Sequence, residues 1–244
     1  MTREYRKKLF DEYFESSFKH GNILTPQQFQ KASEAYEIYY QGIMPEDVGS
    51  VILDFGCGVG DFMYHLKRKG YKNFYGVDIS AQQVDYCRQH ITDRVEAVNG
   101  MDFLKDKKEK YDLIAAHDVL EHIPKDQILE ILHLCHQALK NNGTLILRVP
   151  NMSNPFGLDA RYNDLTHEIG FTSKSLTQAL EISGYKDIRI LPGRKVSVRS
   201  FRHLIRILLV KFLHAALRFC FYIHDYTVPG NLYKNLVVVA KKVG

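Results

Sequence analysis

The segment that decides the fold is Val51-Ile-Leu-Asp-Phe-Gly-Cys-Gly-Val-Gly-Asp61, an apolar run that leads into three closely spaced glycines. A near-continuous apolar run favours a β-strand buried on both faces, as in a parallel sheet. The glycines let the backbone turn tightly and approach a ligand where a Cβ atom would clash. The segment therefore predicts a strand, a ligand-binding turn and the start of a helix.

Similar apolar runs recur along the chain and alternate with amphipathic helical patterns. We expect helices at 80–91, with Ser80 as N-cap, at 125–139, and from Thr172 to Gly184. Alternating β and α units predict a doubly wound α/β domain. The other expected strands are 73–77, 95–98, 111–116, 144–149, 186–191 and 236–240.

The composition limits the class of protein and its organisation. The chain has 244 residues, 45% hydrophobic and 25% charged, which excludes a disordered or low-complexity protein. We divide it into an N-terminal helical lid at 1–46 and an α/β domain at 47–244, with an amphipathic helical insert at 193–230. The four cysteines are widely spaced without a CxxC pair, which argues against a disulfide scaffold and favours a cytoplasmic location. The N-terminus lacks the apolar core of a signal peptide, so we do not expect export.

An acidic residue follows the second expected strand. Tyr75-Gly-Val-Asp78 comes eighteen residues after Gly60, and a carboxylate at this point can bind two ribose hydroxyls. The glycine spacing is GxGxG, preceded by Asp54, and differs from the GxGxxG of dinucleotide folds. Together these details distinguish the glycine turn from a general nucleotide-binding loop.

The Asp54–Gly60 loop with Asp78 resembles the S-adenosylmethionine (SAM) site of class I methyltransferases. The resemblance covers about residues 48–190 and implies a Rossmann-like fold, with helices on both faces of a seven-stranded, mostly parallel sheet whose last strand is antiparallel. It further implies that the glycine loop wraps the methionine part of SAM and that Asp78 binds the ribose. Adenine would contact the 99–104 segment, although the family more often has Asp where Asn99 stands. The cofactor-binding residues expected are Asp54, Gly56, Cys57, Gly58, Gly60, Asp78, Ile79, Asn99, Met101, Asp102 and His117.

Two polar clusters are candidates for acceptor chemistry. His117-Asp-Val-Leu-Glu-His122 follows the fourth strand, where open α/β sheets bind ligands, and Arg161-Tyr-Asn-Asp-Leu-Thr-His-Glu168 lies in the loop after the fifth. An alcohol acceptor must lose its proton near the transition state, whereas a phenol with a pKa near 10 needs less help. We expect His122 or His167 to act as general base, with Asp118 as a further catalytic candidate.

Two interpretations of these clusters remain open. In one, Asp118, Glu121, His122 and His167 surround Mg²⁺ or Mn²⁺ that binds the acceptor hydroxyl. This set resembles the Glu-x-x-Glu-His and distant His of plant small-RNA 2′-O-methyltransferases and, in part, ubiquinone-pathway O-methyltransferases, with Asp118 replacing the first Glu. In the other, the Leu-Glu-His segment caps a helix and shapes the SAM pocket without a metal.

A further resemblance concerns the acceptor. The segments 118–125, 149–157 and 161–176 are similar to bacterial methyltransferases associated with O-antigen and capsule synthesis, which implies O-methylation of a sugar. Arg161, Tyr162, Asp164 and Glu168 would then hydrogen-bond the glycan acceptor, unless they only hold the loop in place. The rival functions are a membrane-associated quinone or phenol O-methyltransferase and a SAM-binding protein without catalysis.

The charge distribution is uneven. The formal net charge is +5, yet residues 186–244 carry +10 and residues 1–185 carry −5. The expected helix at 199–224 combines basic and apolar residues, and Lys211 and Arg218 interrupt any span of a bilayer. Three placements of this helix remain open. It would lie on the anionic inner face of the cytoplasmic membrane, pack on a second subunit in a homodimer, or pack on its own domain in a monomer. We expect no nucleic-acid partner, because aromatic stacking motifs are missing from the basic segment.

Overall fold

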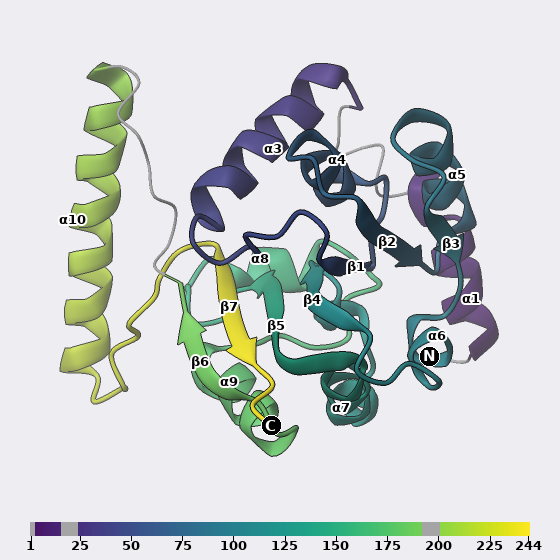
Figure 1. The fold of residues 1–244 in the computed structure, drawn as a ribbon. Helices are drawn as coiled ribbons and strands as arrows, with labels where there is room; N and C mark the ends of the chain where they lie inside the picture. Colours follow the sequence, from purple (N-terminus) through teal and green to yellow (C-terminus); the bar gives the residue numbers. More distant parts are fainter. Residues whose placement is uncertain (1–2, 16–23, 192–200) are drawn as a thin grey trace.

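The computed structural model describes residues 3–15, 24–191 and 201–244, and its centre is a seven-stranded sheet in the order β3-β2-β1-β4-β5-β7-β6 (Figure 1). Strands β1 to β5 pair in parallel, whereas β7 pairs antiparallel with β5 and with β6. This arrangement confirms the expected fold class. The strands are β1 Val51–Phe55, β2 Asn73–Asp78, β3 Val95–Ala97, β4 Tyr111–His117, β5 Leu139–Pro150, β6 Lys186–Ile190 and β7 Asn235–Lys241.

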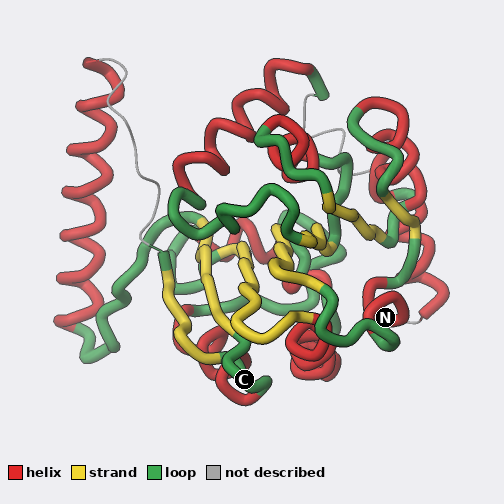
Figure 2. The backbone as a smooth tube through the Cα atoms, viewed as in Figure 1, coloured by secondary structure: helices red, strands yellow, loops and turns green. Residues whose placement is uncertain are grey.

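Helices connect the strands (Figure 2), and two of the expected caps are present. The Ser80 side chain accepts a hydrogen bond from the Gln83 amide, and Thr172 forms a capping box with Ser175. The loop after β5, in which no helix was expected, contains the short helix α8. The helices are α1 Arg3–Asp11, α3 Pro26–Tyr39, α4 Asp61–Arg68, α5 Ala81–His90, α6 Gly100–Leu104, α7 Ile128–Ala138, α8 Gly157–Tyr162, α9 Ser173–Ile182 and α10 Phe201–Ile223, with short 3₁₀ helices η2 Leu120–His122 and η3 Lys125–Gln127.

Two hydrophobic cores lie on the two faces of the sheet. Successive strand residues point to opposite faces, so Leu113 and Ala115 of β4 join one core while Ile114 and Ala116 join the other. Helices α3, α4 and α5 cover the first face, and α7 and α9 cover the second. A sheet buried on both faces explains the near-continuous apolar strand sequences.

The two appendages differ in how they meet this domain. Helix α3 packs on α4, and the Tyr36 ring lies 5.2 Å from the Phe62 ring between centroids. Helix α10, inside the expected insert, stands beside the domain in Figure 1. The part of the insert before Phe201 lies outside the described residues, as do residues 1–2 and 16–23 of the expected lid. Within the described residues, no helix combines the length and apolarity that a bilayer crossing requires.

We predict that Gly60→Ala destabilises the fold by about 2–4 kcal/mol, because a Cβ there combines left-handed strain with a clash. Gly60 has φ 93°, and an added Cβ would lie 2.5 Å from Cys87 Sγ. Gly42→Ala is the matched control, since Gly42 has φ 73° with no atom within 4 Å of its added Cβ. Chemical denaturation measures both free energies of unfolding, and equal losses would contradict the packing role of Gly60.

Candidate active site

A cavity of about 490 Å³ opens at the carboxyl ends of β1, β2 and β4. This is the edge at which open α/β sheets bind their ligands. One part of the cavity is lined by the glycine turn after β1 and the end of β2. Another part is lined by the segment after β4, by helix α1 and by the loop after β5. The cavity therefore has a side suited to a nucleoside cofactor and a side left for an acceptor.

Asp78 holds the glycine turn in place. Its Oδ2 accepts a hydrogen bond of 2.8 Å from the Gly58 amide, and its Oδ1 accepts one of 2.8 Å from the Ser80 amide. Burial raises the pKa of Asp78, while the backbone amides that bond to the carboxylate act in the opposite direction. Gly56 and Gly58 have φ values of 74° and 52°, so the turn uses the left-handed conformations that favour glycine.

Two buried polar groups at the floor of the cavity lack protein partners for one atom each. Asp54 is 2% exposed, and its Oδ2 has no hydrogen-bond partner; His117 Nδ1, 4.0 Å from Asp54 Oδ1, has none either. Burial, followed by the charges of Asp78 and Asp61, raises the pKa of Asp54 well above its usual range. A cofactor with donor groups and positive charge would satisfy this carboxylate, so the site fits SAM.

Most residues expected to bind the cofactor line the cavity, but two do not. Gly60 serves as the N-cap of α4, where its missing Cβ leaves room for Cys87. Asp102 points away as an exposed residue paired with Lys105 at 2.6 Å. The expected residues that line the cavity are Asp54, Gly56, Cys57, Gly58, Asp78, Ile79, Asn99, Met101 and His117.

Three residues from two loops gather on the acceptor side. Glu121, His122 and His167 each offer a ligand atom, and these atoms lie within 4.8 Å of one another. Glu121 is 2% exposed, and its Oε2 has no hydrogen-bond partner. Backbone bonds from the amides of Glu168 and Ile169 to the Glu121 carbonyl join the loops. The two polar sequence clusters thus meet at one point, as the first of the two interpretations requires.

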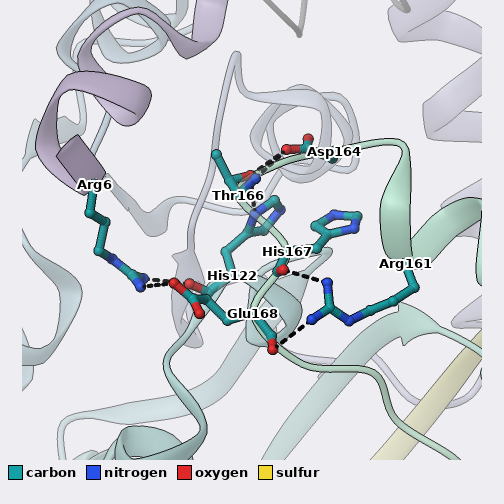
Figure 3. A network of polar contacts seen from close by, with 7 residues as sticks. All are labelled: Arg6, His122, Arg161, Asp164, Thr166, His167 and Glu168. Atoms are coloured by element: carbon teal, nitrogen blue, oxygen red, sulfur yellow. Dashed lines mark hydrogen bonds and ion pairs between the residues drawn. The ribbon is translucent and has the colours of Figure 1, made fainter. Parts of the chain in front are cut away.

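Hydrogen bonds fix the tautomer of both histidines. His167 Nδ1 lies 2.6 Å from the carbonyl oxygen of Ala160, which can only accept, so Nδ1 carries the proton. Thr166 Oγ1 donates to Asp164 at 2.6 Å and therefore accepts from His122 Nδ1 at 2.8 Å (Figure 3). The lone pair of each neutral ring is consequently on Nε2. Burial, followed by the nearby His167, lowers the pKa of His122 to about 4, so the ring is neutral near physiological pH.

The structure does not bring Asp118 into this cluster. Its carboxylate pairs with Arg148, with Nε bonds of 3.1 and 3.0 Å to its two oxygens. The expectation that Asp118 and Glu121 share a helical face fails because Asp118 precedes η2 and turns the chain with φ 55°. Asp118 still lines the cavity, together with Arg148. The expected four-ligand metal set is therefore reduced to three.

The four expected acceptor-binding residues have other roles. Arg161 donates to the carbonyl oxygens of His167, at 2.6 Å, and Glu168, at 3.0 Å (Figure 3). Asp164 accepts from Thr166 and Tyr13, and Glu168 pairs with Arg6 at 2.7 Å. The side chain of Tyr162 is 75% exposed. None of the four lines the cavity, so among the described contacts three hold the loop and Tyr162 faces outward.

Sequence reasoning missed residues of the N-terminal segment and of the chain at the start of β7. Arg6, Phe10 and Tyr13 line the cavity, and the rings of Phe10 and Tyr13 lie 6.3 and 6.1 Å from that of His122 between centroids. Lys234 and Asn235 line it from the other end of the chain. The only sequence signal was the expected role of residues 1–46 as a lid, which did not specify side chains.

The three-residue cluster fits a divalent cation by its donor chemistry. Both imidazoles hold their protons on Nδ1, so each offers Nε2, and the buried Glu121 carboxylate lacks a partner for Oε2. Two nitrogens and one carboxylate are the ligands of Mn²⁺, Fe²⁺ or Zn²⁺ sites more than of the all-oxygen Mg²⁺ sites. Of the two expected cations, these donors would suit Mn²⁺ better than Mg²⁺.

Comparison with known proteins identifies the family. Residues 10–190 match the family model described as a methyltransferase domain, which covers more than half of the chain. The protein therefore belongs to the methyltransferase-domain family. A ubiquinone biosynthesis O-methyltransferase of Glaesserella parasuis serovar 5 is 30% identical over 112 residues, 42% of this chain and 46% of that protein. One from Xylella fastidiosa (strain M23) is 26% identical over 160 residues, 62% of each. The chain thus spans about half of the relatives that it matches.

Solved structures support the fold. A SAM-dependent methyltransferase from Archaeoglobus fulgidus matches with a TM-score of 0.62 at 21% identity, over 96% of this chain and 99% of that chain. Magnesium protoporphyrin IX methyltransferase from Synechocystis PCC 6803, with bound SAM, matches with a TM-score of 0.55 at 16% identity, over 97% of each. These similarities confirm the Rossmann-like methyltransferase fold.

We predict that Glu121→Gln stabilises chelator-treated protein at pH 8. Burial, followed by the charge of Asp118, raises the pKa of Glu121 well above its usual value in the folded state. The stability that Glu121 contributes is present below its unfolded pKa near 4.3 and is lost as pH rises through the folded pKa. The variant should therefore gain at least about 1 kcal/mol at pH 8 and less at pH 5, measured by denaturation.

Glu130→Gln on the exposed side of α7 is the control for the loss of one carboxylate. The prediction is contradicted if Glu121→Gln and Glu130→Gln change the unfolding free energy equally at both pH values.

Proposed function

We propose that the protein is a SAM-dependent O-methyltransferase that methylates a sugar hydroxyl of a surface polysaccharide or of its lipid- or nucleotide-linked precursor. The observation that carries this proposal is the pair of imidazoles, each bonded through Nδ1 and open at Nε2, in the cavity that the glycine turn and Asp78 also line. Membership of the methyltransferase-domain family supports the transfer of a methyl group. The histidines can accept the proton that a weakly acidic alcohol must lose. We place the reaction in the cytoplasm, in keeping with the widely spaced cysteines.

The cofactor side binds and orients SAM. Asp78 would accept hydrogen bonds from the ribose hydroxyls while it continues to hold the Gly58 amide. Asp54 would face a cationic part of the cofactor from the floor of the cavity. In-line transfer breaks the bond from sulfur to the methyl carbon, forms a bond from the acceptor oxygen to that carbon, and leaves the electron pair on sulfur. The remaining requirement is removal of the acceptor proton.

The histidines can remove that proton. Nε2 of His122 or His167 accepts the hydroxyl proton as the oxygen attacks, and the hydrogen bond at Nδ1 stabilises the imidazolium that forms. For His122 this support extends through Thr166 to the carboxylate of Asp164. A divalent cation bound by Glu121, His122 and His167 would instead lower the pKa of the hydroxyl itself. The two routes use the same three residues and differ in their response to chelators.

Polar groups around the acceptor side support a polyol. Asn163, Lys234, Asn235 and the Asp118–Arg148 pair line the cavity and can donate or accept hydrogen bonds. The second candidate is a quinone-type phenol. It is favoured by the two relatives named as ubiquinone biosynthesis O-methyltransferases and by the aromatic rings of Phe10 and Tyr13 at the same opening. The third candidate function is SAM binding without catalysis.

We predict that Asp78→Asn weakens SAM binding about 10- to 100-fold, because hydrogen bonds to a charged acceptor contribute about 1.5–3 kcal/mol each. Asp102→Asn is the matched control, since Asp102 pairs with Lys105 outside the cavity. Isothermal titration with SAM measures both variants. Equal affinities for SAM in Asp78→Asn and wild type would overturn the ribose assignment.

We predict that His122→Asn lowers kcat on a sugar acceptor by about 10²- to 10⁴-fold, with a smaller loss on a phenol, because only the alcohol depends strongly on a base. Sugar nucleotides, lipid-linked glycans and catechols serve as acceptors in a methyl-transfer assay. His133→Asn, on the exposed side of α7, is the control.

Three results of this assay decide between the candidates. Turnover of catechols without any sugar would replace the sugar by a phenol, and SAM binding without turnover of any acceptor would favour a non-catalytic protein. Loss of activity in chelator and its recovery with Mn²⁺ would select the cation route, whereas unchanged activity would select the histidine base.

A further inference from the structure

Helix α10 leaves many large apolar side chains exposed. In Figure 1 it stands beside the sheet domain. Most of its described residues are exposed. Phe201 is 76% exposed and Phe212 is 75% exposed. Exposed apolar patches of this kind mark interaction sites in soluble proteins. The exposed apolar surface therefore indicates that α10 binds a partner.

The structure shows which face of α10 already has a partner. The less exposed residues recur every three or four positions and therefore share one face, which contacts the segment returning to β7. The His214 ring lies 4.9 Å from the Tyr233 ring between centroids, and Arg218 Nη2 donates to the Gly230 carbonyl at 2.9 Å. The residues of this covered face are Ile207, Val210, His214, Leu217 and Phe221.

The opposite face is apolar and points away from the returning segment. At about 100° per residue its members fall within an arc of about 60°. We call this set the outer face: Phe201, Ile205, Leu208, Phe212, Phe219 and Ile223, all exposed.

Cations border the outer face on both sides. Arg202 and Arg206 follow one edge, and Lys211 and Arg218 follow the other, each about 90–130° from its centre. Between Phe201 and Ile223 the sequence has no Asp or Glu. An apolar strip between two rows of cations is the pattern of a helix that lies in a membrane interface, with long basic side chains reaching the lipid phosphates.

We propose that α10 docks the protein on an anionic membrane, with the outer face inserted below the phosphates and the four cations at their level. The charge pattern favours anionic lipid over a second copy of α10, because two such helices would bring cations together without acidic partners. The docking is independent of the acceptor, so it can be tested without knowledge of the substrate.

The docked helix is continuous with the acceptor side of the cavity. Asn151, just after β5, donates through Nδ2 to the carbonyl oxygens of Asn231, at 3.0 Å, and Tyr233, at 2.9 Å. Lys234 and Asn235 follow directly and line the cavity. Only the segment between α10 and β7 therefore separates the membrane-docking helix from the acceptor side of the cavity.

The test is co-sedimentation of the full chain with phosphatidylglycerol-containing vesicles and with pure phosphatidylcholine vesicles. We expect binding to the anionic vesicles only, and weaker binding at high salt. Arg206→Gln with Lys211→Gln should weaken that binding about 30-fold. The matched control, Lys31→Gln with Lys174→Gln, removes the same charge from exposed positions on other helices and should change it little.

Phe212→Glu tests the outer face itself and should abolish vesicle binding without loss of folding, because the side chain is exposed. Leu129→Glu, at an exposed position on α7, should leave vesicle binding unchanged. Equal binding to both lipids, or to neither, overturns the proposal. So does a dimer in sedimentation equilibrium that Phe212→Glu dissociates while wild type ignores anionic vesicles.

Discussion

The hydrogen bonds from the Gly58 and Ser80 amides to Asp78 are the interaction on which the cofactor side depends. They join the turn after β1, the end of β2 and the first turn of α5 through one carboxylate. The backbone amides would otherwise be unsatisfied next to a cavity, and the carboxylate would be buried without partners. Because the turn is already held in place, a bound cofactor does not need to order it.

The acceptor side is organised by a different means. Its two imidazoles belong to separate loops, and each is oriented by an acceptor in the 160–166 segment. Arg161 ties that segment to the His167 carbonyl, and Tyr13 donates to its Asp164. Arg6 of α1 pairs with the neighbouring Glu168 and donates to the His122 carbonyl. The orientation of both rings therefore depends on contacts with the N-terminal segment, which is distant in the sequence. Burial lowers the pKa of His122 and keeps the ring neutral, so the same packing sets its protonation.

Features with a local sequence pattern could be predicted. The expected strands, the caps at Ser80 and Thr172, and the place of Asp78 at the end of β2 follow from apolar runs, side-chain oxygens and glycine spacing. The direction of side chains in irregular loops could not. Asp118 turns the chain with φ 55° and meets Arg148, whereas Glu121 points into the cluster, and no periodicity distinguishes them.

Long-range contacts were equally hidden in the sequence. Nothing in the N-terminal sequence indicates that the rings of Phe10 and Tyr13 would pack beside His122, because amphipathicity does not specify which surface a helix covers. The same holds for His65 of α4, which is 1% exposed and whose Nδ1 lies 3.0 Å from Ser33 Oγ of α3.

The Asn151 clamp on residues 231 and 233 has a consequence for how acceptors reach the enzyme. Because the clamp joins the chain leaving α10 to the end of β5, an enzyme held through α10 keeps its cavity in a restricted orientation. A lipid-linked acceptor in the same leaflet would then diffuse in two dimensions, and its effective concentration would be set by its surface density. An enzyme docked as proposed would need little intrinsic affinity for such an acceptor, and its rate would follow the lipid composition of the membrane more closely than the bulk concentration of acceptor.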